Sequence, residues 1–66
     1  MTIGEIIKRK RNFKQWTMQK LADKCGVTIQ VVFRWEHEEV YPSLLNAITL
    51  ADVFDCTLDE LVGRIR

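Results

Sequence analysis

Two side chains that are chemically able to recognise nucleic-acid bases, Gln30 and Arg34, lie four residues apart in the sequence. A glutamine amide pairs with adenine N6 and N7, and an arginine guanidinium pairs with guanine O6 and N7, each contributing roughly 1–3 kcal/mol of discrimination. Residues four apart share one face of an α-helix, so both groups would project together. On most helices such side chains are simply hydrated. Their role therefore depends on the elements that carry them.

The helix that would carry this pair is predicted over residues 28–36, with Val31, Val32 and Trp35 on its inner side. Its outward face contains two base-reading candidates, two large apolar side chains and the single histidine, namely Ile29, Gln30, Phe33, Arg34 and His37. Adjacent outward apolar side chains are unusual on a small monomer. They favour either contact with thymine methyl groups or contact with a protein partner, and both alternatives remain open.

Five helical segments and no strand are predicted, so the expected class is all-α. Residues 17–36 give two short helices joined at Gly26, the layout of a helix-turn-helix. The predicted helix caps are Thr2, Thr17, Thr28 and Thr57, with Glu60 completing a capping box at Thr57. Pro42 and Ser43 mark the start of the fourth predicted helix. The other predicted buried stripes are Ile3, Ile6, Ile7; Met18, Leu21, Ala22, Cys25; Leu44, Ala47, Ile48, Ala51, Phe54; and Leu58, Leu61, Val62, Ile65, with Trp16 packed at a turn.

Size and composition exclude several classes of protein. A chain of 66 residues is expected to be one domain, residues 1–66. No apolar window is long enough for a membrane span and no secretory signal is visible, which predicts a cytoplasmic protein with no membrane contact. Cys25 and Cys56 lack metal-site spacing, so no metal, cofactor or small-molecule ligand is expected and both are predicted to be small buried side chains. With His37 as the only histidine and no nucleophile motif or glycine-rich loop, an enzyme is not expected.

Charge is distributed unevenly along the chain although the net charge is only +1. Residues 1–36 carry eight basic side chains against three acidic ones, and residues 37–66 carry two basic against six acidic. The imbalance fits a basic face for phosphates and an acidic back.

A set of linked motifs resembles the Cro/CI-type helix-turn-helix domains of the XRE family, a group that includes many phage repressors. The motifs are Thr17, Leu21-Ala22, Gly26-Val27-Thr28, Val32, Trp35-Glu36, Pro42-Ser43-Leu44 and Thr57-Leu58-Asp59-Glu60-Leu61. The resemblance implies a compact five-helix, lambda-repressor-like fold with the helix-turn-helix at its second and third helices. It also implies dimers that bind near-palindromic double-stranded DNA, with the third helix in the major groove.

The resemblance implies roles for particular residues. Base reading would fall on Thr28, Ile29, Gln30, Phe33 and Arg34, and phosphate contact on Thr17, Met18 and the loop of residues 37–41, including His37. Lys20, Lys14 and Lys24 would add phosphate affinity. An ion pair between Arg11 and Glu36 would be structural.

The predicted function is a sequence-specific DNA-binding transcriptional regulator, a repressor acting as a homodimer. The alternative is an antirepressor-like or antitoxin-like module that binds protein. This alternative is motivated by Met18 and Phe33, where the family often has polar residues, and by the segment after Trp35-Glu36. The family often has Asn-Gly there, whereas this chain has His37-Glu38-Glu39, which places two carboxylates where phosphates would approach. The end of the last helix, Val62 and Ile65, together with Phe54, is the predicted dimer surface.

Overall fold

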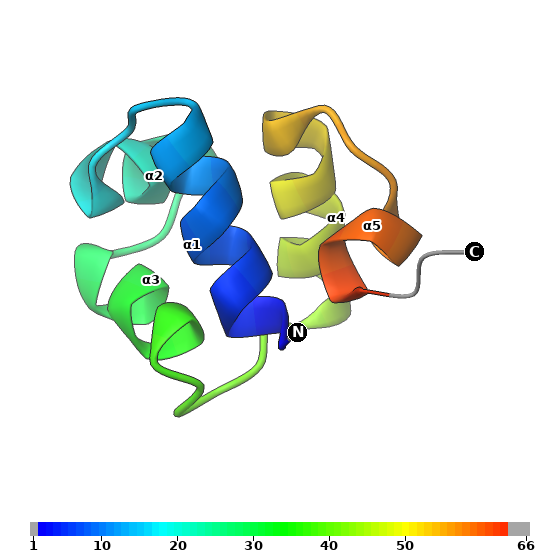
Figure 1. The fold of residues 1–66 in the computed structure, drawn as a ribbon. Helices are drawn as coiled ribbons and strands as arrows, with labels where there is room; N and C mark the ends of the chain where they lie inside the picture. The colour runs from blue at the N-terminus through cyan, green and yellow to red at the C-terminus, as the bar shows by residue number, and fades with distance from the viewer. Residues whose placement is uncertain (1, 64–66) are drawn as a thin grey trace.

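The computed structural model describes residues 2–63 and contains five α-helices (Figure 1). They are α1 (Ile3–Phe13), α2 (Met18–Cys25), α3 (Ile29–Glu36), α4 (Leu44–Phe54) and α5 (Leu58–Val62). The same residues contain no β-strand, so the all-α prediction is confirmed. None of these helices has the length and apolar character that crossing a membrane requires.

Every helix begins after a hydroxyl side chain that accepts a backbone hydrogen bond. The hydroxyls of the five caps, Thr2, Thr17, Thr28, Ser43 and Thr57, each accept the N–H three residues later. Each bond satisfies one of the N–H groups that a helix start leaves without an intrahelical partner. The predicted caps are confirmed, and the capping box of Thr57 and Glu60 is joined by a second one between Thr2 and Glu5.

The core lies where α1 crosses between the α2–α3 pair and the α4–α5 pair (Figure 1). The largest fully buried side chains come from all five helices: Trp35, Ile7, Leu21, Leu50, Leu61 and Val32. Because one core joins every element, burial of apolar area holds α3 in place through its inner side alone.

The predicted buried stripe of α4 is wrong at two positions. Leu44 is 70% exposed and Ile48 is 40% exposed, whereas Leu50, which the pattern did not select, is fully buried. Ala47, Ala51 and Phe54 are buried as predicted. Because α4 carries large apolar side chains on several sides, spacing alone does not identify its inner face.

Three further corrections concern the C-terminal half and the cysteines. Phe54 is only 5% exposed and its ring stacks on Trp16 at a centroid distance of 5.9 Å, so it cannot contribute to a dimer surface. Leu58 and Val62 are only partly covered, and Ile65 lies outside the described residues.

Cys25 and Cys56 are free thiols that are half-buried rather than buried. Cys25 is the last residue of α2 and Cys56 lies in the turn between α4 and α5, and both pack against the edge of the core.

Candidate nucleic-acid interface

A buried ion pair fixes the back of α3 to α1. The Arg11 guanidinium donates from Nε to Glu36 Oε2 at 2.7 Å and from Nη2 to Glu36 Oε1 at 3.1 Å. Its Nη1 donates to the Trp16 carbonyl at 2.8 Å. Side-chain exposure is 10% for Arg11 and 1% for Glu36. The structure therefore forms the pair that the resemblance implies, and the same guanidinium also holds the turn before α2.

Gly4 allows the first turn of α1 to approach the end of α3. A Cβ at this position would lie 2.5 Å from the Trp35 carbonyl oxygen and 2.9 Å from Glu38 Cγ. Those distances are too short for any side chain, so the close approach requires glycine. The sequence did not single out Gly4, because a glycine inside a helix usually lowers helix propensity without revealing a contact.

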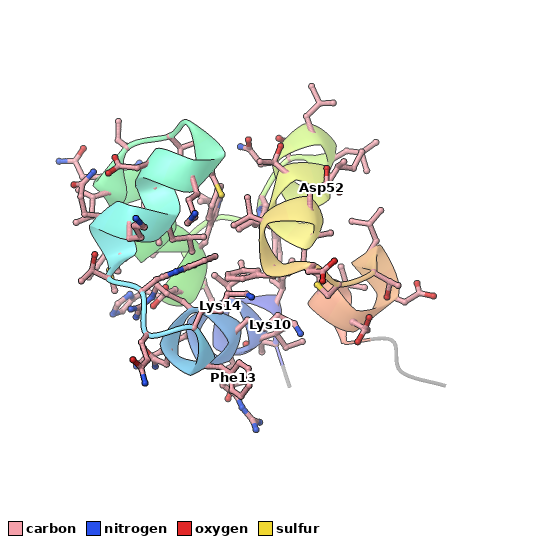
Figure 2. The ribbon with its side chains drawn as sticks, turned by 90° about the horizontal axis from the view of Figure 1, so that it is seen from above. Lys10, Phe13, Lys14 and Asp52 are labelled. Carbon is pink, nitrogen blue, oxygen red and sulfur yellow. The ribbon has the colours of Figure 1, made fainter. Side chains whose placement is uncertain are left out.

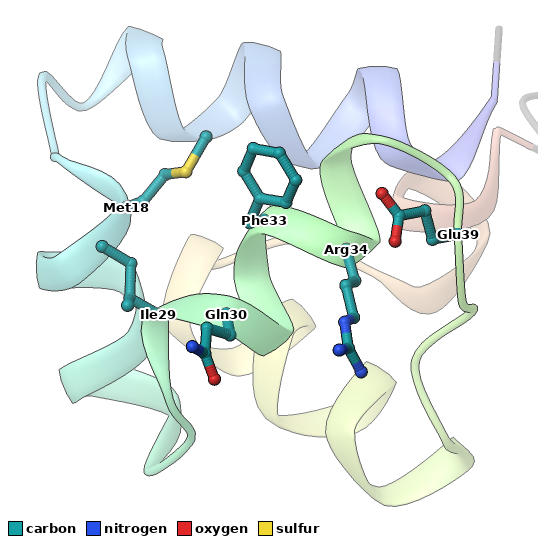
Figure 3. A pocket seen from close by; sticks show the side chains of 6 residues that line it. All are labelled: Met18, Ile29, Gln30, Phe33, Arg34 and Glu39. Atoms are coloured by element: carbon teal, nitrogen blue, oxygen red, sulfur yellow. The ribbon is translucent and has the colours of Figure 1, made fainter.

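The outward face of α3 forms an open hollow of about 480 Å³ (Figure 3). Its lining consists of Met18, Ile29, Gln30, Phe33, Arg34 and Glu39. Five of these six are individually predicted site residues, which the structure brings together, and Glu39 belongs to the loop of residues 37–41 that was predicted to contact phosphate. In Figure 3 the Gln30 amide and the Arg34 guanidinium point out on one side of α3. Ile29 and Phe33 are each a little over 40% exposed, and Met18 is half-buried against the core.

Phe33 and His37 form one unit at the end of α3. Their rings stack with centroids 3.9 Å apart and an interplanar angle of 20°. His37 Nδ1 lies 2.9 Å from the Phe33 carbonyl oxygen, so in the tautomer with a proton on Nδ1 the ring donates to the helix end. The orientation leaves Nε2 as the ring nitrogen for an external partner.

Two threonines begin the helices of the helix-turn-helix. Thr17 Oγ1 accepts the Lys20 N–H at 3.1 Å, and Thr28 Oγ1 accepts the Val31 N–H at 3.4 Å. A hydroxyl that accepts one bond still has its own hydrogen to donate. Each threonine can therefore cap its helix and contact a phosphate, and the positive end of the α2 dipole favours an anion at the same place.

Two of the predicted phosphate-binding lysines gather around Trp16 instead of the hollow. The ammonium groups of Lys14 and Lys24 lie 5.5 Å and 4.9 Å from the centroid of the Trp16 ring, as cation–π contacts. Figure 2 shows Lys14 near Lys10 and Phe13 at the end of α1, with Asp52 on α4. Arg34 is the only cationic side chain among the residues that line the hollow, while Lys20 is exposed in the first turn of α2.

The loop after α3 contains a left-handed residue that the sequence did not reveal. Glu38 has φ of +60°, and the following Glu39 N–H donates to the Arg34 carbonyl at 2.9 Å. A left-handed residue at a helix end favours glycine. The position is therefore one where a glycine would fit better than the glutamate that this chain has.

A sequence profile described as Helix-turn-helix matches residues 7–61 of the chain. The chain belongs to this family, of the Cro/CI type. It is 41% identical over 54 residues to the HTH-type transcriptional regulator AnsR of Bacillus subtilis, covering 82% of this chain and 47% of AnsR. It is 30% identical over 64 residues to the cryptic phage CTXphi transcriptional repressor RstR of Vibrio cholerae, covering 97% of this chain and 57% of RstR. The chain thus spans about half the length of these regulators.

Solved structures of this family share the fold. The P22 c2 repressor protein in complex with synthetic operator 9T has a TM-score of 0.90 and 26% identity, with 94% of each chain covered. The restriction-modification controller protein C.AhdI from Aeromonas hydrophila has a TM-score of 0.84 and 27% identity, with 89% of each chain covered. These likenesses confirm the predicted five-helix repressor-type fold.

Proposed function

We propose that this member of the helix-turn-helix family is a sequence-specific DNA-binding transcriptional repressor that acts in the cytoplasm as a homodimer. The supporting observation is that Gln30 and Arg34 both line the hollow on the outward face of α3, together with Met18 at the capped start of α2. The names of the relatives, which include a transcriptional repressor and a repressor in complex with an operator, agree with this proposal.

In the proposed complex α3 enters the major groove, where Arg34 pairs with a guanine and Gln30 with an adenine. Ile29 and Phe33 contact thymine methyl groups, and the Thr28 hydroxyl at the start of α3 contacts a base edge. Thr17, Met18 and Lys20 lie along the phosphates with the α2 helix start, and His37 donates from Nε2. Because Met18 offers only apolar contact from its side chain, the anion there is held by backbone N–H groups and the Thr17 hydroxyl.

The experiment is a selection from random duplex DNA, followed by titration of the selected sequence. Arg34→Ala is expected to weaken binding of that sequence about 10- to 100-fold and to relax the preference at one base pair. Lys20→Ala is the matched control, since loss of a phosphate contact weakens all sequences alike and lowers the salt dependence. If Arg34→Ala leaves both affinity and preference unchanged, the proposed base-reading role is wrong.

A second candidate function, binding of a protein partner, is favoured by the apolar lining of the same hollow. Met18, Ile29 and Phe33 line it together with the Glu39 carboxylate, a group that repels phosphates. Recording amide chemical shifts during a titration with random-sequence duplex DNA at low salt distinguishes the two functions. Changes in the amide chemical shifts of α3 support DNA binding. If the α3 amide shifts do not change, protein binding replaces DNA binding as the proposed function.

A further inference from the structure

A second hollow, with a volume of about 650 Å³, lies at the surface between α1 and α5. Its floor is apolar, because Ile6 and Phe54 line it and are only 6% and 5% exposed. Phe13 also lines it, and this side chain is 87% exposed, the highest value among the large apolar side chains of residues 2–63. A phenylalanine left uncovered beside an apolar hollow indicates a surface that another molecule covers.

Positive charge surrounds this apolar centre. Arg9, Lys10 and Lys14 line the same hollow, and Glu60 is the one acidic residue among those that line it. The Glu60 carboxylate accepts hydrogen bonds from the N–H and the hydroxyl of Thr57, at 3.0 Å and 3.1 Å, so it is engaged in capping α5. Three cations against one engaged carboxylate favour an anionic partner.

The cations lie on both sides of Phe13. At 3.6 residues per turn, Arg9 is about 40° from Phe13 around the axis of α1 in one direction, and Lys10 is about 60° away in the other. Lys14 follows Lys10 by four residues and extends the second row. Figure 2 shows Lys10, Phe13 and Lys14 together at the end of α1. A partner that contacts the ring of Phe13 therefore meets positive charge on either side of it.

This hollow faces away from α3. Gly4 and Arg11 are residues through which α1 contacts the end of α3. Ile6 and Phe13 each follow one of them by two positions, and two residues turn a helix by about 200°. The hollow and α3 therefore lie on opposite sides of α1, which separates the α2–α3 pair from the α4–α5 pair (Figure 1). A molecule bound between α1 and α5 leaves the outward face of α3 free.

We propose that the hollow between α1 and α5 binds an acidic segment of a partner protein, in which carboxylates flank one large apolar side chain. The apolar side chain packs on Phe13 above the floor of Ile6 and Phe54. The carboxylates pair with the cations on either side. An apolar anchor inside a polar rim is the arrangement found in protein interfaces, and complementary charge orients the encounter. The surface is separate from that of the proposed function, so each holds or fails alone.

Other anionic molecules fit the hollow less well. Duplex DNA would use the cations but has no apolar group that reaches the floor. A single strand could stack a base on Phe13, but Phe54 already stacks on Trp16 and offers no second platform. A small carboxylate ligand requires a pocket that encloses most of its surface, whereas this hollow is open at Phe13.

The test is a titration of the protein with a synthetic peptide, followed by amide chemical shifts at low salt, where attraction between charges is least screened. The probe is a peptide with one phenylalanine between two runs of four glutamates. We expect saturable shift changes confined to residues 6–14 and 57–63, with a dissociation constant on the order of 0.1–1 mM. The peptide with alanine in place of phenylalanine should bind at least fivefold more weakly, since it has no anchor for the hollow.

Substitutions separate the apolar anchor from the charge. Phe13→Ser should weaken peptide binding about tenfold, because the apolar side chain of the peptide loses its partner. Lys10→Gln should weaken it about threefold, through loss of one ion pair. Lys8→Gln is the matched control, since it removes the same charge from an exposed position of α1 that does not line the hollow. It should bind the peptide as the unsubstituted protein does.

Several results would overturn the proposal. Unchanged shifts at 1 mM peptide, or equal binding of the alanine peptide, exclude the apolar anchor. Equal weakening in Lys8→Gln and Lys10→Gln shows attraction to net charge alone. An oligothymidine strand that binds the same residues more tightly than the peptide assigns the surface to nucleic acid. Peptide binding at least tenfold tighter in Ile65→Ser assigns the hollow to the end of this chain.

Discussion

Arg11 and Glu36, 25 positions apart in the sequence, form a two-point ion pair that joins α1 to the last residue of α3. Because the Glu36 side chain is only 1% exposed, the pair is shielded from water. The pair therefore holds the end of α3 against α1. The contact at the Trp16 carbonyl extends this control to the turn that precedes α2.

Replacing one member of this pair should destabilise the fold strongly. Glu36→Gln leaves the Arg11 guanidinium buried without a counter-charge, and removal of one partner from a buried pair costs roughly 3–5 kcal/mol. Urea unfolding followed by circular dichroism measures the change. Glu39→Gln, an exposed neighbour, is the control and should change the free energy of unfolding by less than about 0.5 kcal/mol. A loss below about 1 kcal/mol in Glu36→Gln would show that the pair contributes little.

Gly4→Ala should destabilise the protein although alanine is the better helix former. Alanine gains about 1 kcal/mol of helix propensity over glycine. The new Cβ, however, would lie 2.5 Å from the Trp35 carbonyl oxygen, so backbone must move. Overpacking of this kind costs about 1–3 kcal/mol, and we expect a net loss in thermal unfolding. Asn12→Ala, an exposed substitution in the same helix, should be neutral or stabilising. An increase in stability for Gly4→Ala would mean that α1 and α3 separate easily.

Glu38→Gly should stabilise the fold and strengthen DNA binding together. Glycine adopts the φ of +60° found at Glu38 without the cost of about 1 kcal/mol that other residues carry. The substitution also removes a carboxylate from the loop that approaches phosphates in the proposed complex. Glu38→Gln removes the charge alone, and Gln15→Gly relieves a left-handed residue in the turn between α1 and α2. The first control should strengthen DNA binding only and the second should raise stability only, as measured by unfolding and DNA titration.

Acid should weaken the starts of α1 and α5. Hydrogen bonds from the backbone and side chain of Thr2 lower the pKa of Glu5, and those from Thr57 lower the pKa of Glu60. A carboxyl with a lowered folded pKa stabilises the fold fully above the pKa of a free glutamate, about 4.3. That stabilisation is lost as the pH falls through the lower, folded pKa.

The double variant Glu5→Gln, Glu60→Gln keeps an amide oxygen for each capping bond but has no carboxyl to titrate. Its melting temperature should therefore fall less between pH 5 and pH 2 than that of the unsubstituted protein. Asp59→Asn removes a carboxylate from the same turn of α5 without disturbing the capping box, and should keep the steeper dependence. Identical pH profiles for the double variant and the unsubstituted protein would contradict the assignment.

The sequence by itself determined the helices and the inner side of the helix-turn-helix. Hydroxyl caps and Gly26 act on their neighbours in the chain, so they mark helix ends whatever the rest of the fold does. In the same way, Leu21 on α2 and Val32 and Trp35 on α3 each belong to an apolar stripe with the helical period, and all three are buried as that period predicts. Local hydrogen bonding and periodicity require no knowledge of distant residues.

Only the tertiary structure decided which apolar side chains remain outside. Leu44 and Leu50 are equally apolar, yet the first is 70% exposed and the second fully buried, because α4 is oriented by its neighbours rather than by its own pattern. The requirement for glycine at position 4 arises in the same way, from the close approach of α1 to the end of α3. Each depends on contacts between segments distant in sequence, and such contacts leave no periodic signal in either segment.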